Sequence, residues 1–534
     1  MTRLMTPDQS GFLPFLLILL ATTQLLVACT TLKDRHINQR QPSFAISRDT
    51  PTRLRQLAYT PPDDLPDASG FVLLDSGMDA LSSRLWLADQ AEKSLDVQYY
   101  IFHGDKTGAV VADSLLRAAQ RGVRVRVLLD DIYVFENESN ILALDSQPNL
   151  EIRVFNAFRH RGGNPLVRLS QFLVDGDRLN RRMHNKLFIA DNQYGITGGR
   201  NIGDEYFQAH EEFGFIDLDV LTSGPVVDEM SKAFDDYWNS NAVVPVRAIP
   251  GYKRARQQLP ALGEALSNAR KSMEATPYWK ALQARPLSAQ FQSGEFYWLD
   301  GVAHAVVDPP EKIDGGLHIS DLLLGQMIGL RVDPEEELMI VSPYFVPGKI
   351  GMDWLAYLRS RNVNIKVLTN SLAANDVPLV HAGYARYREP LLDMGVELFE
   401  LKPLPNTSPK RKNLAGSGSS RSSLHAKTFV FDRKRAFIGS FNFDPRSALL
   451  NTELGLVIDS PIIAEIVALM SGQGMAPLNS HRLSLSNGKD GKNRIVWTSE
   501  TDQGPVGTDG EPNATRWQRF LMDVLMLLPI EGNL

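Results

Sequence analysis

Hydrophobic positions after Phe71 follow helical and strand periods in turn. Residues 78–94 place Leu81, Leu85 and Ala88 on one helical face, and the apolar run LDVQYYIF follows as a predicted strand. The alternation continues through ADSLLRAAQRG, VRVRVLLDD and LEIRVFNAF. Strands that alternate with amphipathic helices predict an α/β fold with a mixed, mainly parallel sheet and covering helices.

The same order of patterns returns later in the chain, in ELMIVSPYFV, MDWLAYLRSRN, VNIKVLTNS and VELFELKPL. A polar motif also occurs twice, as RRMHNKLFIADNQYGITGGRN and as SLHAKTFVFDRKRAFIGSFN. One offset of 241 residues relates the following pairs: His184 and His425, Lys186 and Lys427, Asp191 and Asp432, Gly198 and Gly439, Asn201 and Asn442, Glu212 and Glu453. So many matches at one offset predict two pseudo-symmetric α/β/α domains.

A chain of 534 residues is long enough for two large domains with a sizeable core. Hydrophobic residues at 43% and charged residues at 22% argue against general disorder, and a net charge of −6 argues against a dedicated nucleic-acid binder. The patterns predict these parts: a signal peptide at 1–28, a tether at 29–70, a first domain at 71–240, a connector with an excursion at 241–335, and a second domain with a C-terminal helix at 336–534.

An apolar stretch from Phe12 to Val27 follows a weakly cationic start, which is typical of a signal peptide. It ends in LLVAC, and Cys29 is the only cysteine, so no disulfide forms within the chain. The ending resembles the bacterial lipobox, in which the cysteine is lipidated; an uncleaved anchor and a chance cysteine are the alternatives. The lipobox predicts a lipoprotein of the bacterial cell envelope, anchored to a membrane and facing the periplasm.

In each motif the histidine and the lysine are two residues apart on a predicted strand, so their side chains point to the same side. Two copies brought together would surround one anion with two imidazoles, two ammonium groups and two amides. One imidazole can then attack phosphorus while the other protonates the leaving oxygen, as a double displacement requires. A lone H-x-K is more often structural, but its duplication favours catalysis.

A metal site is the other interpretation of histidine with aspartate. Lysine is a poor neighbour for a divalent cation, and the sequence contains no ligand cluster of the usual spacing. We therefore expect neither a metal nor a cofactor.

The duplicated pattern H-x-K, four residues, D, six residues, G-G/S-x-N resembles the phospholipase D superfamily, and the resemblance extends from Phe71 to the C-terminus. It implies a pseudo-dimeric fold with one shared active site and a phosphohistidine formed without a metal. The site residues that it implies are His184 as nucleophile, His425 as general acid/base, Lys186, Lys427, Asn201 and Asn442 as phosphate ligands, and Glu212 and Glu453 as acids that orient the imidazoles. The motif members Asp191 and Asp432 are expected to hold the turn after each strand.

Sequence symmetry leaves the two histidine roles open. Arg200 follows the first glycine pair, whereas Phe441 follows Gly439 and Ser440 in the second motif. A cation beside His184 would disfavour its protonated form and make it the better nucleophile, provided that Arg200 points into the site.

Within the superfamily, LDVQYYIFHGDKTG, the lipobox and the ending RWQRFLMDVLMLLPIE resemble the bacterial cardiolipin synthase C group. This implies a phosphatidyltransferase that makes cardiolipin from phospholipids such as phosphatidylglycerol or phosphatidylethanolamine. Basic segments precede both motifs, and they either gather anionic headgroups or are solvated loops: Arg159, Arg161, Arg168, Arg178, Arg181 and Arg182 before the first, PKRKNLAGSGSSRSS before the second.

The C-terminal segment has an apolar stripe at helical spacing, which predicts a helix that lies on a membrane or packs on its own domain. The stripe contains Trp517, Phe520, Leu521, Val524, Leu525 and Leu528. Two rival functions use the same catalytic residues, namely hydrolysis by a phospholipase D and cleavage by a nuclease of the superfamily. Because small nucleases of this type commonly carry one motif, we expect phospholipids and a membrane surface as partners, and no nucleic acid.

Overall fold

The computed structural model describes residues 40–158, 171, 174–210, 213–405, 421–487, 493–501 and 504–527. Several predicted features lie outside these residues: the signal peptide, Cys29, Arg159, Arg161, Arg168, Glu212, Leu528 and most of the basic segment before the second motif.

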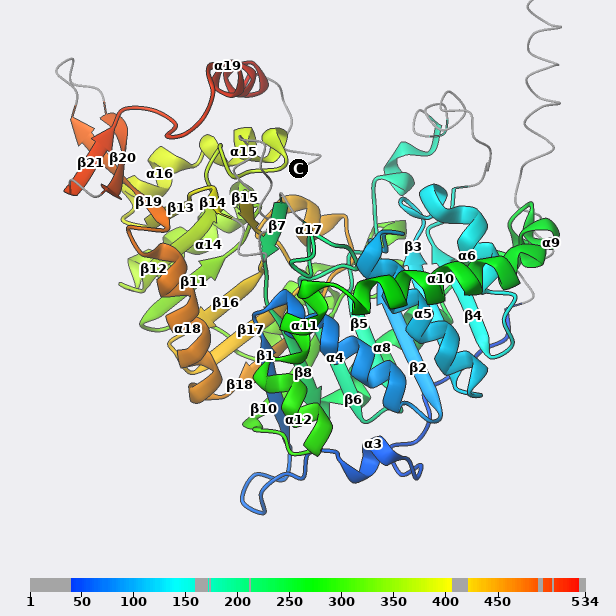
Figure 1. The fold of residues 1–534 in the computed structure, drawn as a ribbon. Helices are drawn as coiled ribbons and strands as arrows, with labels where there is room; N and C mark the ends of the chain where they lie inside the picture. Colours follow the sequence, from blue (N-terminus) through cyan, green and yellow to red (C-terminus); the bar gives the residue numbers. More distant parts are fainter. Residues whose placement is uncertain are drawn as a thin grey trace, which may run out of the picture.

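Within the described residues, an 18-stranded sheet runs through both halves of the chain (Figure 1). The first half, residues 40–298, contributes β1 (Ala68–Leu74), β2 (Ser94–Tyr99), β3 (Arg124–Asp130), β4 (Leu150–Phe155), β5 (Leu187–Ala190), β6 (Tyr194–Gly198), β8 (Asp219–Ser223) and β9 (Val243–Pro245). The second half, residues 299–527, contributes β10 (Leu299–Val307), β11 (Glu337–Val341), β12 (Asn364–Asn370), β13 (Glu397–Leu401), β16 (Thr428–Phe431), β17 (Arg435–Gly439), β18 (Leu454–Asp459), β19 (Ser480–Asn487), β20 (Asn493–Thr501) and β21 (Gly504–Thr508).

The strand order is pseudo-symmetric about the antiparallel pair of β1 and β10, in which Ala68 lies opposite Val302. Outward from this pair, the first half runs β1-β8-β6-β5-β2-β3-β4-β9. The second half runs β10-β18-β17-β16-β11-β12-β13-β19-β20-β21. The predicted α/β fold with two pseudo-symmetric units is confirmed.

Parallel pairing in this sheet is confined, among the described strands, to β2–β3–β4 and β11–β12–β13. Each motif instead folds into an antiparallel hairpin, β5–β6 or β16–β17. A connection this short can join only antiparallel neighbours, because a parallel pair needs a long crossover. The sheet is therefore mixed, and not mainly parallel as the helix and strand alternation had suggested.

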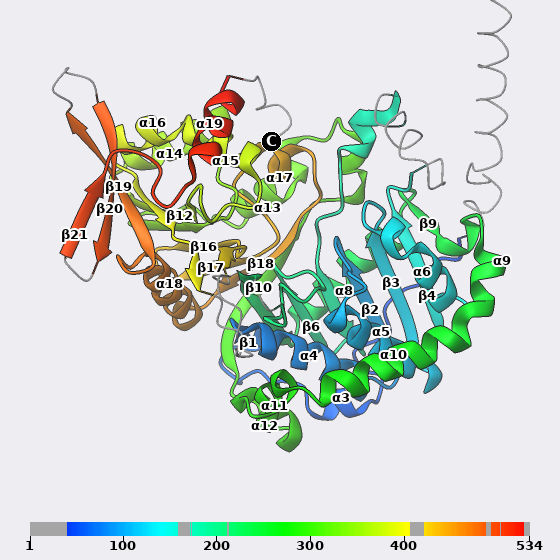
Figure 2. The same ribbon diagram turned by 45° about the horizontal axis from the view of Figure 1, so that its top comes forward.

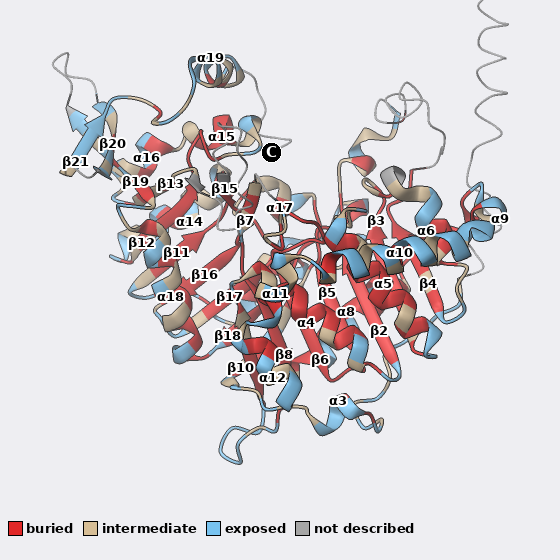
Figure 3. Cartoon of the chain, in the orientation of Figure 1, coloured by how far each residue is buried: buried red, intermediate tan, exposed pale blue. Residues whose placement is uncertain are grey.

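Helices cover both faces of the sheet. The helices α8 (Val226–Trp238) and α18 (Pro461–Met475) lie on one face, where they share a hydrophobic core that crosses between the halves. The other face is covered in the first half by α4 (Gly77–Gln90), α5 (Lys106–Gln120) and α6 (Glu138–Leu144), and in the second by α13 (Leu323–Gly329), α14 (Gly348–Ser360) and α16 (Arg388–Asp393). Figure 3 shows most strands as buried, β20 and β21 as largely exposed, and the outer helix surfaces as exposed.

The remaining helices lie at the edges and ends of this sandwich. They are α3 (Arg53–Gln56), α9 (Tyr252–Ala255), α10 (Leu259–Glu274), α11 (Pro277–Gln283), α12 (Pro286–Ser293), α15 (Pro378–Ala385), α17 (Pro445–Leu449) and α19 (Arg516–Leu525). Short 3-10 turns are η1 (Val134–Asn137), η2 (Val246–Ala248), η3 (Arg256–Gln258), η4 (Pro310–Asp314) and η5 (Ile319–Asp321). In the described part of the chain, no helix has the length and apolar character that crossing a bilayer requires.

Two segments expected as linkers are parts of the folded body. In the expected tether, Leu54 is fully buried and the Tyr59 hydroxyl donates to Asp300 at 2.7 Å. In the expected connector, β10 pairs with β18 just as β1 pairs with β8, and α10 packs along α5. The strand pattern of LDGVAHAVV is hard to recognise in the sequence because Pro- and Gly-rich stretches surround it.

Candidate active site

The two motif histidines lie just before β5 and β16, where the halves meet. The His184 backbone N–H donates to the Thr452 carbonyl at 2.9 Å, and the His425 N–H donates to the Ile216 carbonyl at 2.8 Å. Beside them, β7 (Phe213–Ile216) pairs in parallel with β15 (Arg421–Leu424), which also pairs with β14 (Leu404–Pro405). Each half therefore holds the backbone of the other half's histidine, and Figure 2 shows the two halves side by side.

Each imidazole is oriented by a carboxylate from the opposite half. Nδ1 of His184 lies 2.9 Å from a carboxylate oxygen of Glu453, and Nδ1 of His425 lies 2.5 Å from a carboxylate oxygen of Asp217. All four side chains are buried. With Nδ1 bound in this way, each ring presents Nε2 for reaction.

Asp217 holds the place that the sequence offset had assigned to Glu212. In the second half, Gly439 pairs with Gly455, and Glu453 stands two residues before that partner. In the first half, Gly198 pairs with Asp219, and Asp217 stands two residues before it. The intervening loop is five residues longer in the first half, so the offset of 241 residues does not apply beyond the hairpin. The prediction of Glu453 agrees with this geometry, whereas the prediction of Glu212 as the orienting acid is corrected to Asp217.

The two motif lysines are almost completely buried beside the imidazoles. The ammonium groups of Lys186 and Lys427 donate to the carbonyls of His184 and His425, respectively. Burial lowers the pKa of Lys186 to about 7 and that of Lys427 to about 8, although the charges of Glu453 and Asp217 oppose both changes.

The histidines share this positive environment. Burial, the largest cause, and the two lysines lower the pKa of His184 to about 4 and that of His425 to about 3, while Glu453 and Asp217 oppose the change. Burial alone would raise the pKa of Asp217, but His425 and Lys427 outweigh it and hold that pKa well below its usual range. A bound phosphate would raise the pKa values of all four basic groups, so the site is suited to an anion.

The motif asparagines lie next to the two glycine turns. The Asn201 amide donates to the Tyr206 hydroxyl at 3.0 Å, and its carbonyl oxygen accepts from the Ile101 N–H at 3.2 Å. The carbonyl oxygen of Asn442 is buried with no hydrogen-bond partner within the described protein atoms. Both asparagines are buried near the site, and their role as phosphate ligands stays a prediction.

Aromatic rings pack against both imidazoles. Tyr100 contacts His184 edge to face at a centroid distance of 5.2 Å, while Tyr206 and Phe215 lie 5.3 and 4.8 Å from His425. The sequence patterns did not identify these residues. Tyr100 lies within the predicted strand LDVQYYIF and directly follows the end of β2 at Tyr99, so its position in an apolar strand segment was the available signal.

The motif aspartates lie away from the imidazoles and bind backbone. Asp191 accepts from the N–H groups of Glu92, Lys93 and Ser94, and Asp432 accepts from those of residues 335–337. Both have positive φ, 51° and 53°, in the turn after the strand. This geometry agrees with the expectation that both aspartates hold the turn after the strand. Neither of them contacts the reacting groups.

Arg200 does not point at His184, so the argument for the histidine roles fails. Its guanidinium donates to the carbonyls of Leu74, Asp75 and Asp217, on the side of the carboxylate that orients His425. The Ser440 hydroxyl, at the matching position of Gly199, donates to Glu453. Gly199 itself has no room for a side chain, because a Cβ there would lie 2.1 Å from Asp217.

The described arginines before the first motif are held by the protein. Arg182 is fully buried against Asp130, Arg178 binds Asp175, and Arg181 donates to the Lys312 carbonyl at 3.2 Å. They stabilise the loop and are not available as a headgroup-binding patch. Among the described residues, no three His, Cys, Asp or Glu side chains are grouped as metal ligands.

Comparisons with known proteins agree with this geometry. Residues 86–238 and 333–471 match the family described as "Cardiolipin synthase, PLD-like domain". Cardiolipin synthase C of Escherichia coli (strain K12) is 39% identical over 472 residues, which cover 87% of this chain and 96% of the relative. Cardiolipin synthase A of Pseudomonas syringae pv. syringae (strain B728a) is 25% identical over 402 residues, covering 75% of this chain and 67% of the relative.

A solved structure shares the fold. The phosphatidylserine synthase of Haemophilus influenzae Rd KW20 superposes with a TM-score of 0.50 at 16% identity, covering 77% of this chain and 87% of that one. The family match includes both motif hairpins, and the two halves assemble them into one site. This chain belongs to the cardiolipin synthase, PLD-like domain family of the phospholipase D superfamily.

Proposed function

We propose that the protein is a phosphatidyltransferase that makes cardiolipin by moving a phosphatidyl group from one phospholipid to the hydroxyl of another. The observation that carries the proposal is the pair of buried imidazoles, each held through Nδ1 by a carboxylate of the opposite half and flanked by a lysine. The family membership and the 39% identity to a cardiolipin synthase support the choice of substrate class.

The proposed reaction has two steps. Nε2 of His184 attacks phosphorus and forms a P–N bond, while the P–O bond to the headgroup alcohol breaks and His425 gives that oxygen its proton. The acceptor hydroxyl then loses its proton to His425 and attacks phosphorus, and the P–N bond breaks. Lys186 and Lys427 stabilise charge on the non-bridging oxygens in both steps.

The choice of His184 as nucleophile rests on the superfamily resemblance, since both rings are held through Nδ1 by a carboxylate and flanked by a lysine. Stopping the reaction in acid and mapping the phosphorylated peptide tests it. Label on the peptide that contains His184 supports the assignment, and label on the peptide that contains His425 reverses the two roles. Alanine at either position is expected to abolish turnover, because each ring has its own task in one two-step reaction.

Product analysis with purified protein tests the function itself. With phosphatidylglycerol alone, we expect cardiolipin and free glycerol as the products. Phosphatidylethanolamine is then added as a second candidate donor. We expect the activity to survive EDTA. Phosphatidic acid as the main product would identify a hydrolase, and cleavage of nucleic acid without action on lipids would identify a nuclease. A loss in EDTA that added metal restores would contradict the metal-free chemistry.

We further propose that the protein works as a membrane-anchored lipoprotein that faces the periplasm. The lipobox sequence ending at Cys29 supports this location. Substrates embedded in a bilayer require an enzyme held at its surface, and an acyl anchor at the N-terminus provides that attachment.

A further inference from the structure

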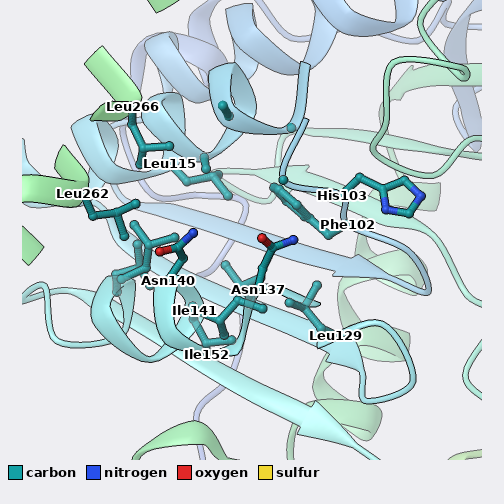
Figure 4. Close-up of a pocket in the computed structure, with 17 residues that line it drawn as sticks. Phe102, His103, Leu115, Leu129, Asn137, Asn140, Ile141, Ile152, Leu262 and Leu266 are labelled. Carbon is teal, nitrogen blue, oxygen red and sulfur yellow. The ribbon is translucent and has the colours of Figure 1, made fainter. Parts of the chain in front are cut away.

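An apolar pocket lies in the first half (Figure 4). Its cavity volume is about 100 Å³, on the order of the roughly 150 Å³ of apolar cavities that bind small hydrocarbons. Residues of β3, β4, α5 and α6 form its walls, and α10 closes one end. Figure 4 shows Phe102 and His103 at one end of the pocket and Leu262 and Leu266 at the other.

The lining is suited to hydrocarbon. Among the described residues, it contains no Asp, Glu, Lys or Arg, and most of the side chains are aliphatic, such as Leu115, Leu129 and Ile152. Its polar side chains are those of His103, Asn137 and Asn140. Burying methylene groups there is favourable, whereas burying a polar group without a partner is costly, so the pocket favours an aliphatic chain over a polar ligand.

The Phe102 end of the pocket adjoins the catalytic machinery. Phe102 follows Ile101, whose N–H donates to the motif residue Asn201 at 3.2 Å. From His103, successive ring contacts lead through Tyr133 and Tyr100 to His184, with centroid distances of 6.0, 5.5 and 5.2 Å. This end of the pocket therefore lies three ring contacts away from a phosphate bound at His184.

We propose that this pocket binds one acyl chain of the phospholipid whose phosphate reacts at His184. The proposal rests on the proposed function, because it takes a phospholipid as the substrate. α10 belongs to the excursion between the two motif-bearing parts, so a segment outside both motifs forms the end of the acyl-chain site.

Chain-length dependence tests the pocket. The probes are dihexanoyl and dioctanoyl phosphatidylglycerol, both kept below the concentrations at which they form micelles. For the wild-type chain we expect kcat/KM to be higher for the dioctanoyl lipid by roughly tenfold, the effect of two more buried methylene groups on one chain. In Ala109→Phe the added ring occupies the space beside Ala109, which lines the pocket, so this preference is expected to fall toward one.

The matched control is Ala265→Phe, which adds the same ring to an exposed position on α10 and should keep the wild-type preference. Equal kcat/KM for the two lipids in the wild type, or an unchanged preference in Ala109→Phe, would overturn the pocket while leaving phosphatidyl transfer intact. Failure of the wild type to act on either lipid would instead overturn the proposed function.

A second measurement is independent of turnover and of the variants' stability. Phosphatidylglycerol with a diazirine near the end of one acyl chain is photolysed with the wild-type protein, and the labelled peptides are mapped. We expect label on peptides from 106–120 and 259–274, which contain α5 and α10. Label confined to other peptides would place the acyl chain elsewhere.

Discussion

At the scale of single residues, each imidazole depends on a carboxylate from the other half of the chain. Glu453 binds His184 and Asp217 binds His425, so neither half alone contains both members of either proposed catalytic pair. The buried positive charge of two lysines is balanced by these two carboxylates. This crossed arrangement determines which acids matter for the reaction.

Asp217→Asn is expected to lower kcat by about 10³- to 10⁴-fold, because losing the carboxylate that orients a catalytic histidine has an effect of that order in other enzymes. Glu212→Gln serves as the matched control and should keep near-normal kcat. Steady-state kinetics on phosphatidylglycerol measures both variants. The opposite result, with Glu212 essential and Asp217 dispensable, would restore the assignment made from the sequence offset.

The two histidines should also make stability depend on pH. Their pKa values are about 4 and 3 in the folded protein and about 6.5 in an unfolded chain. The unfolded state therefore binds more protons between these values, so their contribution is fully present above about pH 6.5 and is lost as the pH falls toward 4. We expect a loss on the order of a few kcal/mol at pH 5.

Denaturant unfolding at pH 7.5 and pH 5 measures this effect. The double variant His184→Gln with His425→Gln should lose less stability between the two pH values than the wild type does. Added phosphate should also reduce the loss, because a bound anion raises the folded-state pKa values. An equal pH dependence in wild type and double variant would contradict the prediction.

At the scale of elements, α19 has one packed side and one exposed side. Met522 is buried against Leu372 and Ala382, whereas Trp517 is 67% exposed and Phe520 is 56% exposed. Met522 lies outside the predicted stripe; within the stripe, Leu525 packs on the same cluster, whereas Trp517, Phe520 and Val524 face solvent. The segment before α19 is held by Glu511, whose carboxylate binds Arg388 at 2.5 Å, and Figure 1 shows α19 at the edge of the second half, next to α15.

We expect the exposed side of α19 to bind anionic lipid surfaces. Trp517→Ala with Phe520→Ala should weaken binding to phosphatidylglycerol vesicles by at least about tenfold, since two aromatic side chains lose their burial in the interface. Cosedimentation in a Cys29→Ser background measures this without the acyl anchor. Ile350→Ala removes an exposed apolar side chain from α14 and should leave binding unchanged. Unaltered binding in the double variant would show that α19 packs only on its own domain.

At the scale of the whole molecule, both halves share one sheet and exchange segments at the site. The antiparallel β1–β10 pair and the core around α8 and α18 join them. The first half is therefore not expected to catalyse the reaction without the second. The proposed anchor acts on this whole body, since Cys29 precedes all of the described elements.

Cys29→Ser is expected to abolish lipid labelling and to release the protein from the membrane or block its processing, because the predicted anchor needs this thiol. Radiolabelled fatty acid and membrane fractionation measure the two effects. Lipid label that persists in the variant would rule out the lipobox. Ser320→Ala, at an exposed position, is the control and should keep the label.

The sequence by itself determined the repeat, the fold class and the paired histidines and lysines, because these depend on local patterns. Strand and helix periods identified β2, α5 and β3, and the spacing of each motif put His184 and Lys186 on one side of a strand. Such features depend on residues that are only a few positions apart in the sequence, because covalent geometry limits how their side chains can be placed relative to one another.

Only the tertiary structure decided which acid serves which ring. Asp217 stands in a loop that is five residues longer than its counterpart, so strand register, and not the sequence offset, aligns it with Glu453. Contacts between distant segments likewise decide three other features. They are the carbonyl groups that Arg200 binds, the pairing of β10 with β1, and the closure of one end of the pocket by α10. These contacts are set by packing and burial, which no local period of the sequence encodes.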